Sequence, residues 1–156
     1  MNYIKISDAP LNNESYKVGI VVSLFNNAVT KALLDGALEQ FATLGIASED
    51  ITVVEVPGAV EIPFFINRLA RTAKFDIFVA LGAVIRGETT HYDYVCEQVS
   101  NGCQRVSLDL DVPVVFGVLT VENDAQAWDR IDGKHGHKGK DAATSAVSML
   151  QTLKLL

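Results

Sequence analysis

Four short apolar runs constrain the fold of this chain more than any other feature of its sequence. The runs are Val18 to Ser23, Ile51 to Val56, Phe75 to Ile85 and Val112 to Val121. Each is rich in valine and isoleucine, and its hydrophobicity is nearly continuous along the run. Such runs are typical of strands that are buried on both faces of a parallel sheet. The sequence therefore predicts a four-stranded parallel sheet.

Segments with helical spacing separate and follow these runs. Their apolar stripes are Val29, Leu33, Ala37, Phe41 and Leu44, then Tyr92, Val95, Cys96, Val99, Cys103 and Val106, and finally Ala143, Ala146, Val147, Leu150 and Leu153. Gly45 is well placed to end the first helix. Repeated strand-helix units favour right-handed crossovers and helices on both faces of a sheet. We therefore predict an α/β protein, a flavodoxin-like three-layer α/β/α sandwich with one domain over residues 1–156.

The overall charge of the chain limits its partners. The formal net charge is -6, which argues against nucleic acid because nucleic-acid-binding domains usually carry a basic face. An anionic substrate would need a local group of positive side chains. No apolar run is long enough to span a bilayer, and residues 1–10 lack the apolar segment of a signal peptide. We expect neither a membrane partner nor a nucleic-acid partner.

The two cysteines indicate a reducing compartment. Cys96 and Cys103 lie seven residues apart in a predicted helix. A rise of about 1.5 Å per residue separates them by roughly 10 Å, which is too far for a disulfide. Two buried, unpaired thiols are typical of the cytoplasm, which is the location we expect.

Chemically useful side chains gather where the predicted strands end. In open parallel sheets, ligands bind beyond the carboxyl ends of the strands. The residues found there include Phe25, Glu61, Arg86, Thr89, Thr90, His91 and Arg130. A stacking ring beside a carboxylate suits a flat heterocycle that bears hydroxyls. A helix start with threonines and an arginine suits phosphate, and a histidine there could transfer protons.

Each of these side chains also has an ordinary structural interpretation. Phe25 could belong to the core, and Arg86 and Arg130 could form surface ion pairs. A threonine could simply cap a helix, and Glu61 could be a favourable charge in a first helical turn. The segment Gly133 to Lys140, "GKHGHKGK", could be a basic phosphate-binding loop or a solvated connector. Its two histidines, without cysteine or paired carboxylates, form a poor metal-ligand set.

Taken together, the motifs resemble one known family. They are "FNN" after the first strand, "VPGAVEIP" after the second, "LGAVIRGETTHYDYVC" after the third, "PVVFGVLTVEN" at the fourth and "HKGKDAA" before the last helix. This series is similar to lumazine synthase, 6,7-dimethyl-8-ribityllumazine synthase, and runs in order from about Val18 to Leu150. The two longest motifs are specific enough to make a chance match negligible.

The resemblance implies the penultimate step of riboflavin biosynthesis. In that reaction 5-amino-6-(D-ribitylamino)uracil condenses with 3,4-dihydroxy-2-butanone 4-phosphate to give the lumazine, phosphate and water. It implies no metal and no organic cofactor. It also implies a homo-oligomer of pentamers with active sites at subunit interfaces, and riboflavin synthase as a possible partner. The connector "GKHGHKGK" has no insertion, as in members that form icosahedral 60-mers.

The resemblance also assigns roles to matching residues. Phe25 corresponds to the ring that stacks on the pyrimidine, and His91 to the proton-transfer residue. The other pyrimidine and ribityl contacts correspond to Ala59, Val60, Glu61, Ala83, Val84, Ile85 and Phe116. Phe116 is expected to act across a subunit interface. The phosphate contacts correspond to Glu88, Thr89, Arg130 and Lys138.

Three single positions depart from the family pattern, and "RID" from Arg130 replaces a more usual Arg-Ala-Gly. Leu24 stands where arginine is common, Val60 replaces a frequent aromatic residue, and Glu88 replaces a small one. An inward-pointing Glu88 would repel phosphate, whereas binding through backbone N–H groups would avoid that repulsion. Two alternatives to the enzyme stay open. One is a flavin- or lumazine-binding protein with weak or no turnover, and the other is a protein whose role is to form a shell.

Overall fold

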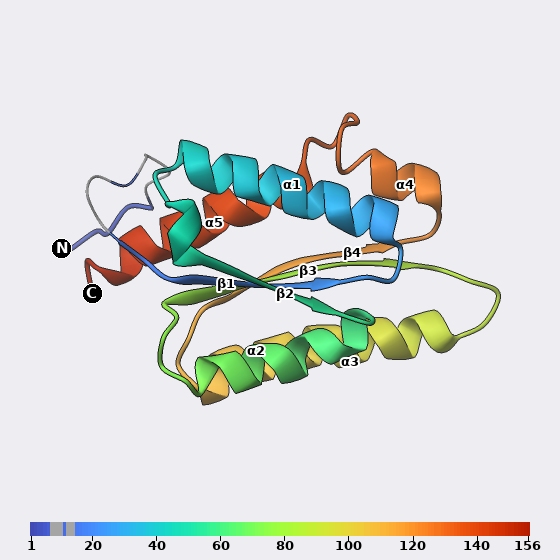
Figure 1. Cartoon of the computed structure of the whole chain (residues 1–156), viewed down its shortest axis with the longest axis horizontal. Helices are drawn as coiled ribbons and strands as arrows, with labels where there is room; N and C mark the ends of the chain where they lie inside the picture. Colours follow the sequence, from blue (N-terminus) through green and yellow to red (C-terminus); the bar gives the residue numbers. More distant parts are fainter. Residues whose placement is uncertain (7–10, 12–14) are drawn as a thin grey trace.

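A parallel sheet of four strands forms the centre of the molecule (Figure 1). The computed structural model describes residues 1–6, 11 and 15–156. The strands are β1 (Val18–Ser23), β2 (Ile51–Val56), β3 (Ile77–Ile85) and β4 (Val114–Val121). They lie in the order β2-β1-β3-β4, and every neighbouring pair is parallel. The predicted α/β class and its four-stranded parallel sheet are confirmed.

The third and fourth strands begin two residues later than their apolar runs. Asp76 lies before β3, and its carboxylate accepts a hydrogen bond from the Lys17 backbone N–H at 2.6 Å. Pro113 precedes β4 and has no N–H to donate to the ladder, although its carbonyl accepts from the Phe78 N–H at 2.9 Å. Hydropathy reports neither the side-chain bond of Asp76 nor the missing N–H of Pro113, so the apolar runs place both strand starts too early.

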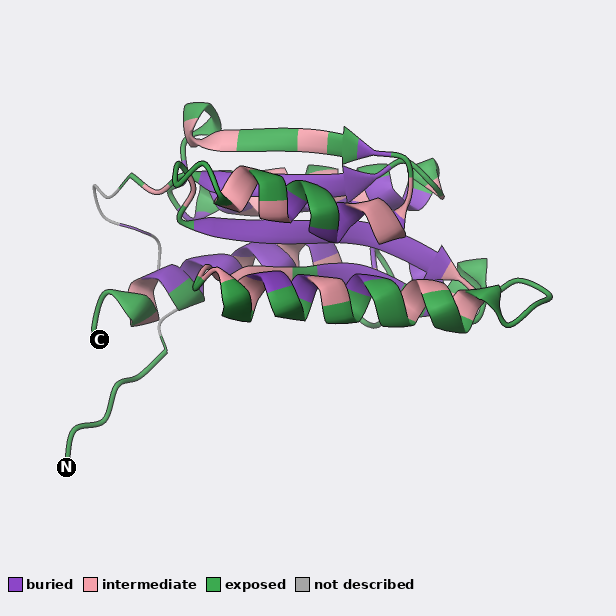
Figure 2. Ribbon diagram, turned by 90° about the horizontal axis from the view of Figure 1, so that it is seen from below, coloured by how far each residue is buried: buried purple, intermediate pink, exposed green. Residues whose placement is uncertain are grey.

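Burial differs between the centre and the edges of the sheet (Figure 2). Every residue of β1 is buried, and so is all of β3 except Ile85. In contrast, most of β2 is exposed or half-buried, and β4 is mixed. The prediction of burial on both faces is therefore right for the two central strands and wrong for β2. As an edge strand, β2 has a neighbour on one side only.

Helices cover both faces of the sheet and complete the predicted three layers (Figure 1). One face carries α1 (Asn27–Thr43), α4 (Asp124–Trp128) and α5 (Lys138–Leu153), and the other carries α2 (Ile62–Ala70) and α3 (His91–Asp109). Two short 3-10 helices, η1 (Ser48–Asp50) and η2 (Ala59–Glu61), flank β2. Gly45 follows α1 with a φ of 90°, as predicted for a helix end.

The predicted helical stripes face the sheet with one exception. All five residues of the α1 stripe are buried, as are Val99, Cys103 and Val106 of α3. Leu153 is 48 % exposed, because α5 ends at this residue. Both cysteines are free thiols, with Cys103 buried and Cys96 half-buried. Burial raises the pKa of Cys103 to about 12 and also raises that of Cys96.

A small apolar cluster fixes the carboxyl end of the sheet. Its buried members are Val29, Leu33, Ala83, Leu119, Val121, Ala127 and Ile131. These residues come from α1, β3, β4, α4 and the segment that follows α4. The loops at the carboxyl ends of the strands are therefore attached to well-packed residues. Among the residues that the structure describes, no helix is long and apolar enough to cross a membrane.

Candidate active site

A cavity of about 630 Å³ opens beyond the carboxyl ends of β1, β2 and β3. Its lining residues are Phe25, Asn26, Gly58, Ala59, Val60, Glu61, Ala83, Val84, Ile85, Gly87, Thr89, His91, Tyr92, Val95 and Gln98. Nine of these are residues to which the family resemblance gives a role: Phe25, Ala59, Val60, Glu61, Ala83, Val84, Ile85, Thr89 and His91. Three loops and one helix start thus converge where the topology of a parallel sheet predicts a ligand site.

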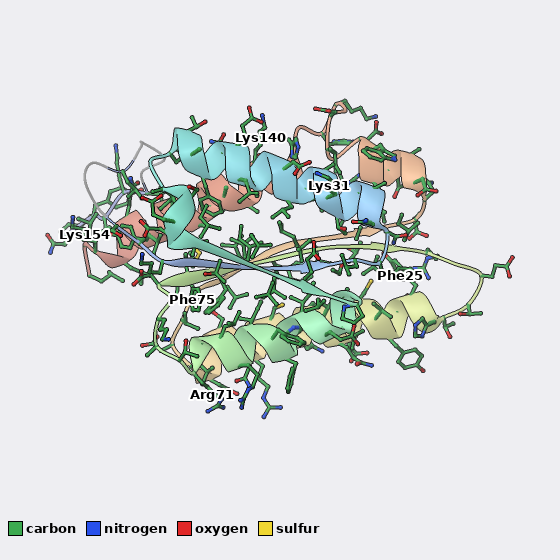
Figure 3. The ribbon with its side chains drawn as sticks, in the orientation of Figure 1. Phe25, Lys31, Arg71, Phe75, Lys140 and Lys154 are labelled. Atoms are coloured by element: carbon green, nitrogen blue, oxygen red, sulfur yellow. The ribbon has the colours of Figure 1, made fainter. Side chains whose placement is uncertain are left out.

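The loop after β1 presents an aromatic ring to this cavity. Backbone pairing with the β2 segment continues past the strand, because the Leu24 and Phe25 N–H groups donate to the Val56 and Pro57 carbonyls at 2.8 and 3.1 Å. The Phe25 side chain is 72 % exposed at this end of the sheet (Figure 3). The core interpretation of Phe25 is therefore wrong, and its ring is available for stacking.

Asn26 anchors the same loop to the central strand. Its backbone adopts the left-handed conformation, φ 59° and ψ 46°, which asparagine tolerates better than most residues. Its side-chain amide donates to the Ala83 carbonyl at 2.8 Å, and its own carbonyl accepts from the Val29 and Thr30 N–H groups that begin α1. Asn26 therefore holds Phe25 in place, a role that the "FNN" motif does not reveal.

The end of β3 offers backbone groups to the cavity. Pairing between β1 and β3 stops at Val22 and Leu81, whereas pairing between β3 and β4 continues to Ile85 and Val121. The edge of β3 that faces β1 therefore lacks a strand partner over its last residues. The Asn26 amide already binds the Ala83 carbonyl, and the other backbone groups of this edge suit a planar heterocycle that carries donors and acceptors.

Glu61 lines the cavity at the end of the η2 turn. Its backbone N–H donates to the Gly58 carbonyl at 3.3 Å. Its carboxylate lies so close to Gly58 that a Cβ there would sit 3.0 Å from Oε2. Glu61 is half-buried and directly precedes α2. The carboxylate can accept hydrogen bonds from hydroxyls of a ligand in the cavity.

The turn from Gly87 to Thr90 leads into the start of α3. All four of its residues are exposed, and a Cβ at Gly87 would meet nothing within 4 Å. The Thr89 hydroxyl accepts a hydrogen bond from the His91 N–H at 3.3 Å, while the Thr90 side chain makes no capping hydrogen bond. The Asp93 N–H donates to the Thr90 carbonyl at 3.0 Å, so an anion at the start of this 19-residue helix would bind the remaining N–H groups of the turn and first helical turn. His91 is exposed beside them.

Arg86 forms ion pairs, as its structural interpretation predicts. Its Nε donates to Glu122 Oε2 at 2.7 Å, and its Nη1 donates to Asp93 Oδ1 at 3.3 Å. The guanidinium carbon also lies 4.1 Å from the centre of the Tyr92 ring. The Glu122 hydrogen bond raises the pKa of Arg86, and burial raises the pKa of Tyr92. Arg86 stays charged and its partner ring stays neutral.

Four predicted residues do not line this cavity: Glu88, Phe116, Arg130 and Lys138. Glu88 is exposed, and Phe116 is 42 % exposed in the middle of β4. Arg130 and Lys138 lie together, because the Lys138 N–H donates to the Arg130 carbonyl at 2.8 Å. Arg130 Nη1 donates to the Gln126 carbonyl at 2.9 Å, and Lys138 Nζ pairs with Asp141 at 2.7 Å.

Other lining residues received no site role from the sequence. They are Asn26, Gly58, Gly87, Tyr92, Val95 and Gln98. Helical periodicity by itself identifies Tyr92 and Val95 as members of an apolar stripe and gives them no role in the site. Gln98 follows them at the same three-residue spacing, which places it on a neighbouring part of the helix face. Extending that spacing along α3 from Tyr92, the residue after His91, would have identified Val95 and Gln98.

His137 has a structural position in the connector before α5. Its Nδ1 accepts from the Lys140 N–H at 3.5 Å and so caps α5. The imidazole packs so tightly on α1 that a Cβ at Gly36 would lie 2.1 Å from it. The described residues contain no group of three or more metal-ligating side chains, either in this connector or elsewhere.

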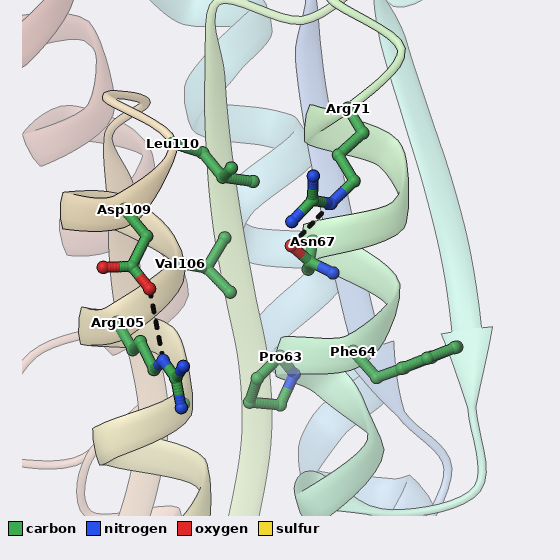
Figure 4. A pocket seen from close by; sticks show the side chains of 9 residues that line it. Pro63, Phe64, Asn67, Arg71, Arg105, Val106, Asp109 and Leu110 are labelled. Atoms are coloured by element: carbon green, nitrogen blue, oxygen red, sulfur yellow. Dashed lines mark hydrogen bonds and ion pairs between the residues drawn. The ribbon is translucent and has the colours of Figure 1, made fainter.

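A second hollow, of about 320 Å³, lies between α2 and α3 (Figure 4). It shares no lining residue with the cavity at the sheet edge. Its two arginines are engaged within their own helices, Arg105 with Asp109 at 3.1 Å and Arg71 with Asn67 at 3.2 Å. These local pairs leave the sheet-edge cavity as the better candidate for chemistry.

Comparison with known proteins agrees with this geometry. The family described as 6,7-dimethyl-8-ribityllumazine synthase matches residues 15–154. The chain belongs to this family. Proteins named 6,7-dimethyl-8-ribityllumazine synthase from Coxiella burnetii strains CbuG_Q212, RSA 493 / Nine Mile phase I and Dugway 5J108-111 are each 51% identical to it over 144 residues. The matches cover 92% of this chain and 95% of each relative.

The resemblance to the lumazine synthase family that the motifs suggested is thus confirmed. Three of them meet in space, since "FNN", "VPGAVEIP" and "VIRGETTHYDYV" all line the one cavity. The fourth spans β4 and ends just before α4, and the fifth forms the start of α5, which lies on the other face of the sheet from α3 (Figure 1). A lumazine synthase site drawn from all five motifs therefore extends beyond this cavity.

Proposed function

We propose that this chain condenses 5-amino-6-(D-ribitylamino)uracil with 3,4-dihydroxy-2-butanone 4-phosphate to give 6,7-dimethyl-8-ribityllumazine, phosphate and water. This transferase reaction belongs to riboflavin biosynthesis. The observation that carries the proposal is the cavity at the sheet edge, where nine residues with expected substrate roles come together. Membership of the family supports the same conclusion.

In this proposal the pyrimidine lies between the Phe25 ring and the open edge of β3. The ring is exposed enough to stack on a flat heterocycle. The backbone of Ala83, Val84 and Ile85 can exchange hydrogen bonds with the amide groups of the uracil. Glu61 accepts from ribityl hydroxyls, and Ala59 and Val60 provide the adjoining wall.

The phosphate of the second substrate binds at the start of α3. Thr89 and the backbone N–H groups of the turn hold its oxygens. Glu88 is exposed and does not line the cavity, so its backbone N–H can contribute while its carboxylate faces solvent. Arg130 and Lys138 complete the binding of the phosphate with two positive charges.

Three of the assigned side chains, Phe116, Arg130 and Lys138, lie outside the cavity of their own chain. We infer that a neighbouring subunit supplies them, so that the complete site lies at a subunit interface. Large apolar side chains that are exposed in one chain support such contacts: Phe64, Tyr94, Leu108 and Phe116. The free thiols Cys96 and Cys103 are consistent with a cytoplasmic enzyme.

His91 moves protons during the steps between the two substrates and the lumazine. The course we propose is Schiff base formation, elimination of phosphate, ring closure and loss of water. In the elimination a proton leaves carbon as the C–O bond to phosphate breaks, whereas the other steps move protons to or from nitrogen and oxygen, and an imidazole can perform such transfers near neutral pH. Because the condensation also proceeds without catalyst, holding the two substrates together supplies much of the acceleration.

Turnover by the purified protein tests the proposal. With both substrates present, lumazine absorbance should appear faster than in the uncatalysed condensation. The His91→Ala variant should lower kcat by about 10-fold or more, as for a positioned proton-transfer group. Absence of any acceleration by the wild-type protein would reject the synthase and favour the ligand-binding alternative. A His91→Ala enzyme at full speed would remove only the proton-transfer role.

A further inference from the structure

Arg86 joins three elements at the edge of the candidate site. It follows β3 directly, and its own N–H donates to the Val121 carbonyl at the end of β4. Its side chain reaches Glu122 just beyond β4 and both Tyr92 and Asp93 in the first turn of α3. One side chain therefore fastens the start of α3 to the end of the sheet.

The Glu122 end of this bridge is itself fixed. The Glu122 N–H donates to the Gln126 side chain at 2.9 Å, and the Gln126 N–H donates to the Asn123 side chain at 3.0 Å. The Gln126 carbonyl also accepts from the Arg130 guanidinium. Hydrogen bonds thus run from α4, on one face of the sheet, through Arg86 to α3 on the other face.

The turn that Arg86 secures has little other support. Residues 87–90 are exposed, and Gly87 has no neighbour at its open side within 4 Å. His91 directly precedes Tyr92 and Asp93, which are the two contacts of Arg86 in α3. An isolated surface ion pair contributes little, but a guanidinium that bridges two carboxylates and stacks on a ring restricts the local geometry.

We propose that Arg86 is a positioning residue that holds His91 in its proton-transfer orientation through Tyr92 and Asp93. The inference depends on the proposed function, because it assumes the role of His91 given above. Arg86 does not line the cavity, and its Nε and Nη1 already donate to carboxylates. Its effect therefore reaches the reaction through the start of α3 and not through contact with substrate.

Steady-state kinetics of four variants test this role. Arg86→Ala should lower kcat by about 5-fold and change KM for either substrate by less than about 2-fold, because misplacing a catalytic group slows the reaction. Arg86→Lys keeps the charge but cannot bridge both carboxylates, so its kcat should fall between wild type and Arg86→Ala. Glu122→Gln should lower kcat in the same direction. Arg105→Ala, which removes a comparable arginine pair elsewhere on α3, should leave kcat unchanged.

A double-mutant cycle separates positioning from other roles. In a His91→Ala background, adding Arg86→Ala should reduce kcat by less than about 1.5-fold, because no imidazole is left to position. Equal effects of Arg86→Ala in both backgrounds would overturn the inference. So would an unchanged kcat with a raised KM for the phosphorylated substrate, which would indicate direct phosphate contact. If Arg86→Ala does not fold, Arg86→Lys and Glu122→Gln in the same two backgrounds give the answer.

The failure of the inference can be told apart from failure of the proposed function. Slow turnover by His91→Ala with full-speed Arg86→Ala removes only the role of Arg86. Full-speed turnover by His91→Ala removes the proton-transfer role and the inference together. Absence of wild-type turnover rejects the enzyme itself.

Discussion

Arg130 is the residue whose proposed role is easiest to isolate by mutation. It belongs to a short segment in which a backbone hydrogen bond joins it to Lys138. Arg130→Ala should raise KM for the phosphorylated ketose by about 10-fold or more, because a charge-assisted hydrogen bond to phosphate is lost. KM for the pyrimidine substrate should change little. Initial rates at varied concentrations of each substrate measure both effects.

The matched control for Arg130→Ala is Lys134→Ala. Lys134 is exposed in the same connector and carries the same charge, but the proposed function gives it no phosphate contact. An equal rise in KM from both substitutions would indicate a general effect of positive charge and would contradict a specific pair. An unchanged KM for the phosphorylated ketose in Arg130→Ala would contradict the assignment outright.

At the residue scale, the sequence predicted site residues best where a motif follows the end of a predicted strand. Phe25, Glu61, Thr89 and His91 all follow strands that the apolar runs predict, and all four line the cavity. Asn26 was missed because its importance depends on a left-handed backbone and a bond to Ala83, which hydropathy cannot report. Arg86 was found as a conspicuous charge, but its partners come from segments seven and 36 residues away.

The helices α1 and α5 are packed so closely that one added methyl group should lower the stability of the protein. A Cβ at Gly139 in α5 would lie 2.1 Å from the Leu33 carbonyl oxygen of α1, which is backbone and cannot rotate away. Gly139→Ala should therefore lower the free energy of unfolding by about 3 kcal/mol. The melting temperature should fall by roughly 10 °C, measured by scanning calorimetry.

Gly87→Ala is the control for that experiment. A Cβ at Gly87 meets nothing within 4 Å, so the substitution adds a methyl group in open space. Its melting temperature should stay within about 2 °C of wild type, as for an ordinary surface substitution. A Gly139→Ala protein as stable as Gly87→Ala would show that α1 and α5 can separate at little cost.

An ion pair at the amino ends of β1 and β2, away from the cavity, should make the stability of the protein depend on pH. The Asp50 carboxylate accepts hydrogen bonds from the Lys17 ammonium and from the Ser15 hydroxyl, the latter at 3.0 Å. The Lys17 bond is the larger cause, and together they lower the pKa of Asp50 below its usual 3.8. A lowered pKa in the folded state stabilises the protein above the usual pKa, and this contribution is lost as the pH falls through the folded value.

Asp50→Asn should therefore melt below wild type at pH 7, and the difference should shrink as the pH drops below about 4. Melting curves between neutral and acid pH measure that trend. Asp35→Asn is the control, since Asp35 pairs with exposed Lys31 one turn away on α1, and such pairs contribute little. A difference that stays constant with pH would mean that Asp50 acts through something other than its charge.

At the element scale, apolar periodicity predicted the long elements and missed the short ones. The α1 stripe was right at every position because all five residues face the sheet. The helix α4 has only five residues, too few to show a period, and it begins because Asn123 accepts a hydrogen bond from the Gln126 N–H. The prediction that β2 is buried on both faces was also wrong. Local hydropathy does not show which strand lies at the edge of the sheet.

The charge of the whole molecule makes the local arrangement of cations important. A net charge of -6 repels a phosphorylated substrate at long range. Arg130 and Lys138 lie beside each other on the α4 and α5 face, whereas the start of α3 lies on the other face (Figure 1). A phosphate site that needs these two cations and the start of α3 is therefore more readily completed between neighbouring chains than within one chain. On this proposal the enzyme must form an oligomer to be active.

The connector before α5 bears on how far that assembly goes. Within it, the His135 N–H donates to the Asp129 carbonyl at 3.1 Å, and Gly133 pairs with Gly136 in an isolated bridge. The connector is thus short and tied to the end of α4. The family resemblance associates a connector without an insertion with shell formation, and on that basis we propose that this chain assembles pentamers into a 60-mer.

The native mass decides this last prediction. Sixty copies of a 16.9 kDa chain give about 1 MDa, whereas a pentamer gives about 85 kDa. Sedimentation velocity of the purified protein should find the larger particle. A short Gly-Ser insertion after Lys134 should shift the mass toward the pentamer, because it loosens the hydrogen-bonded connector. Retained turnover in that variant would indicate that the active site needs the pentamer but not the shell. A wild-type mass that stops at the pentamer would reject the shell.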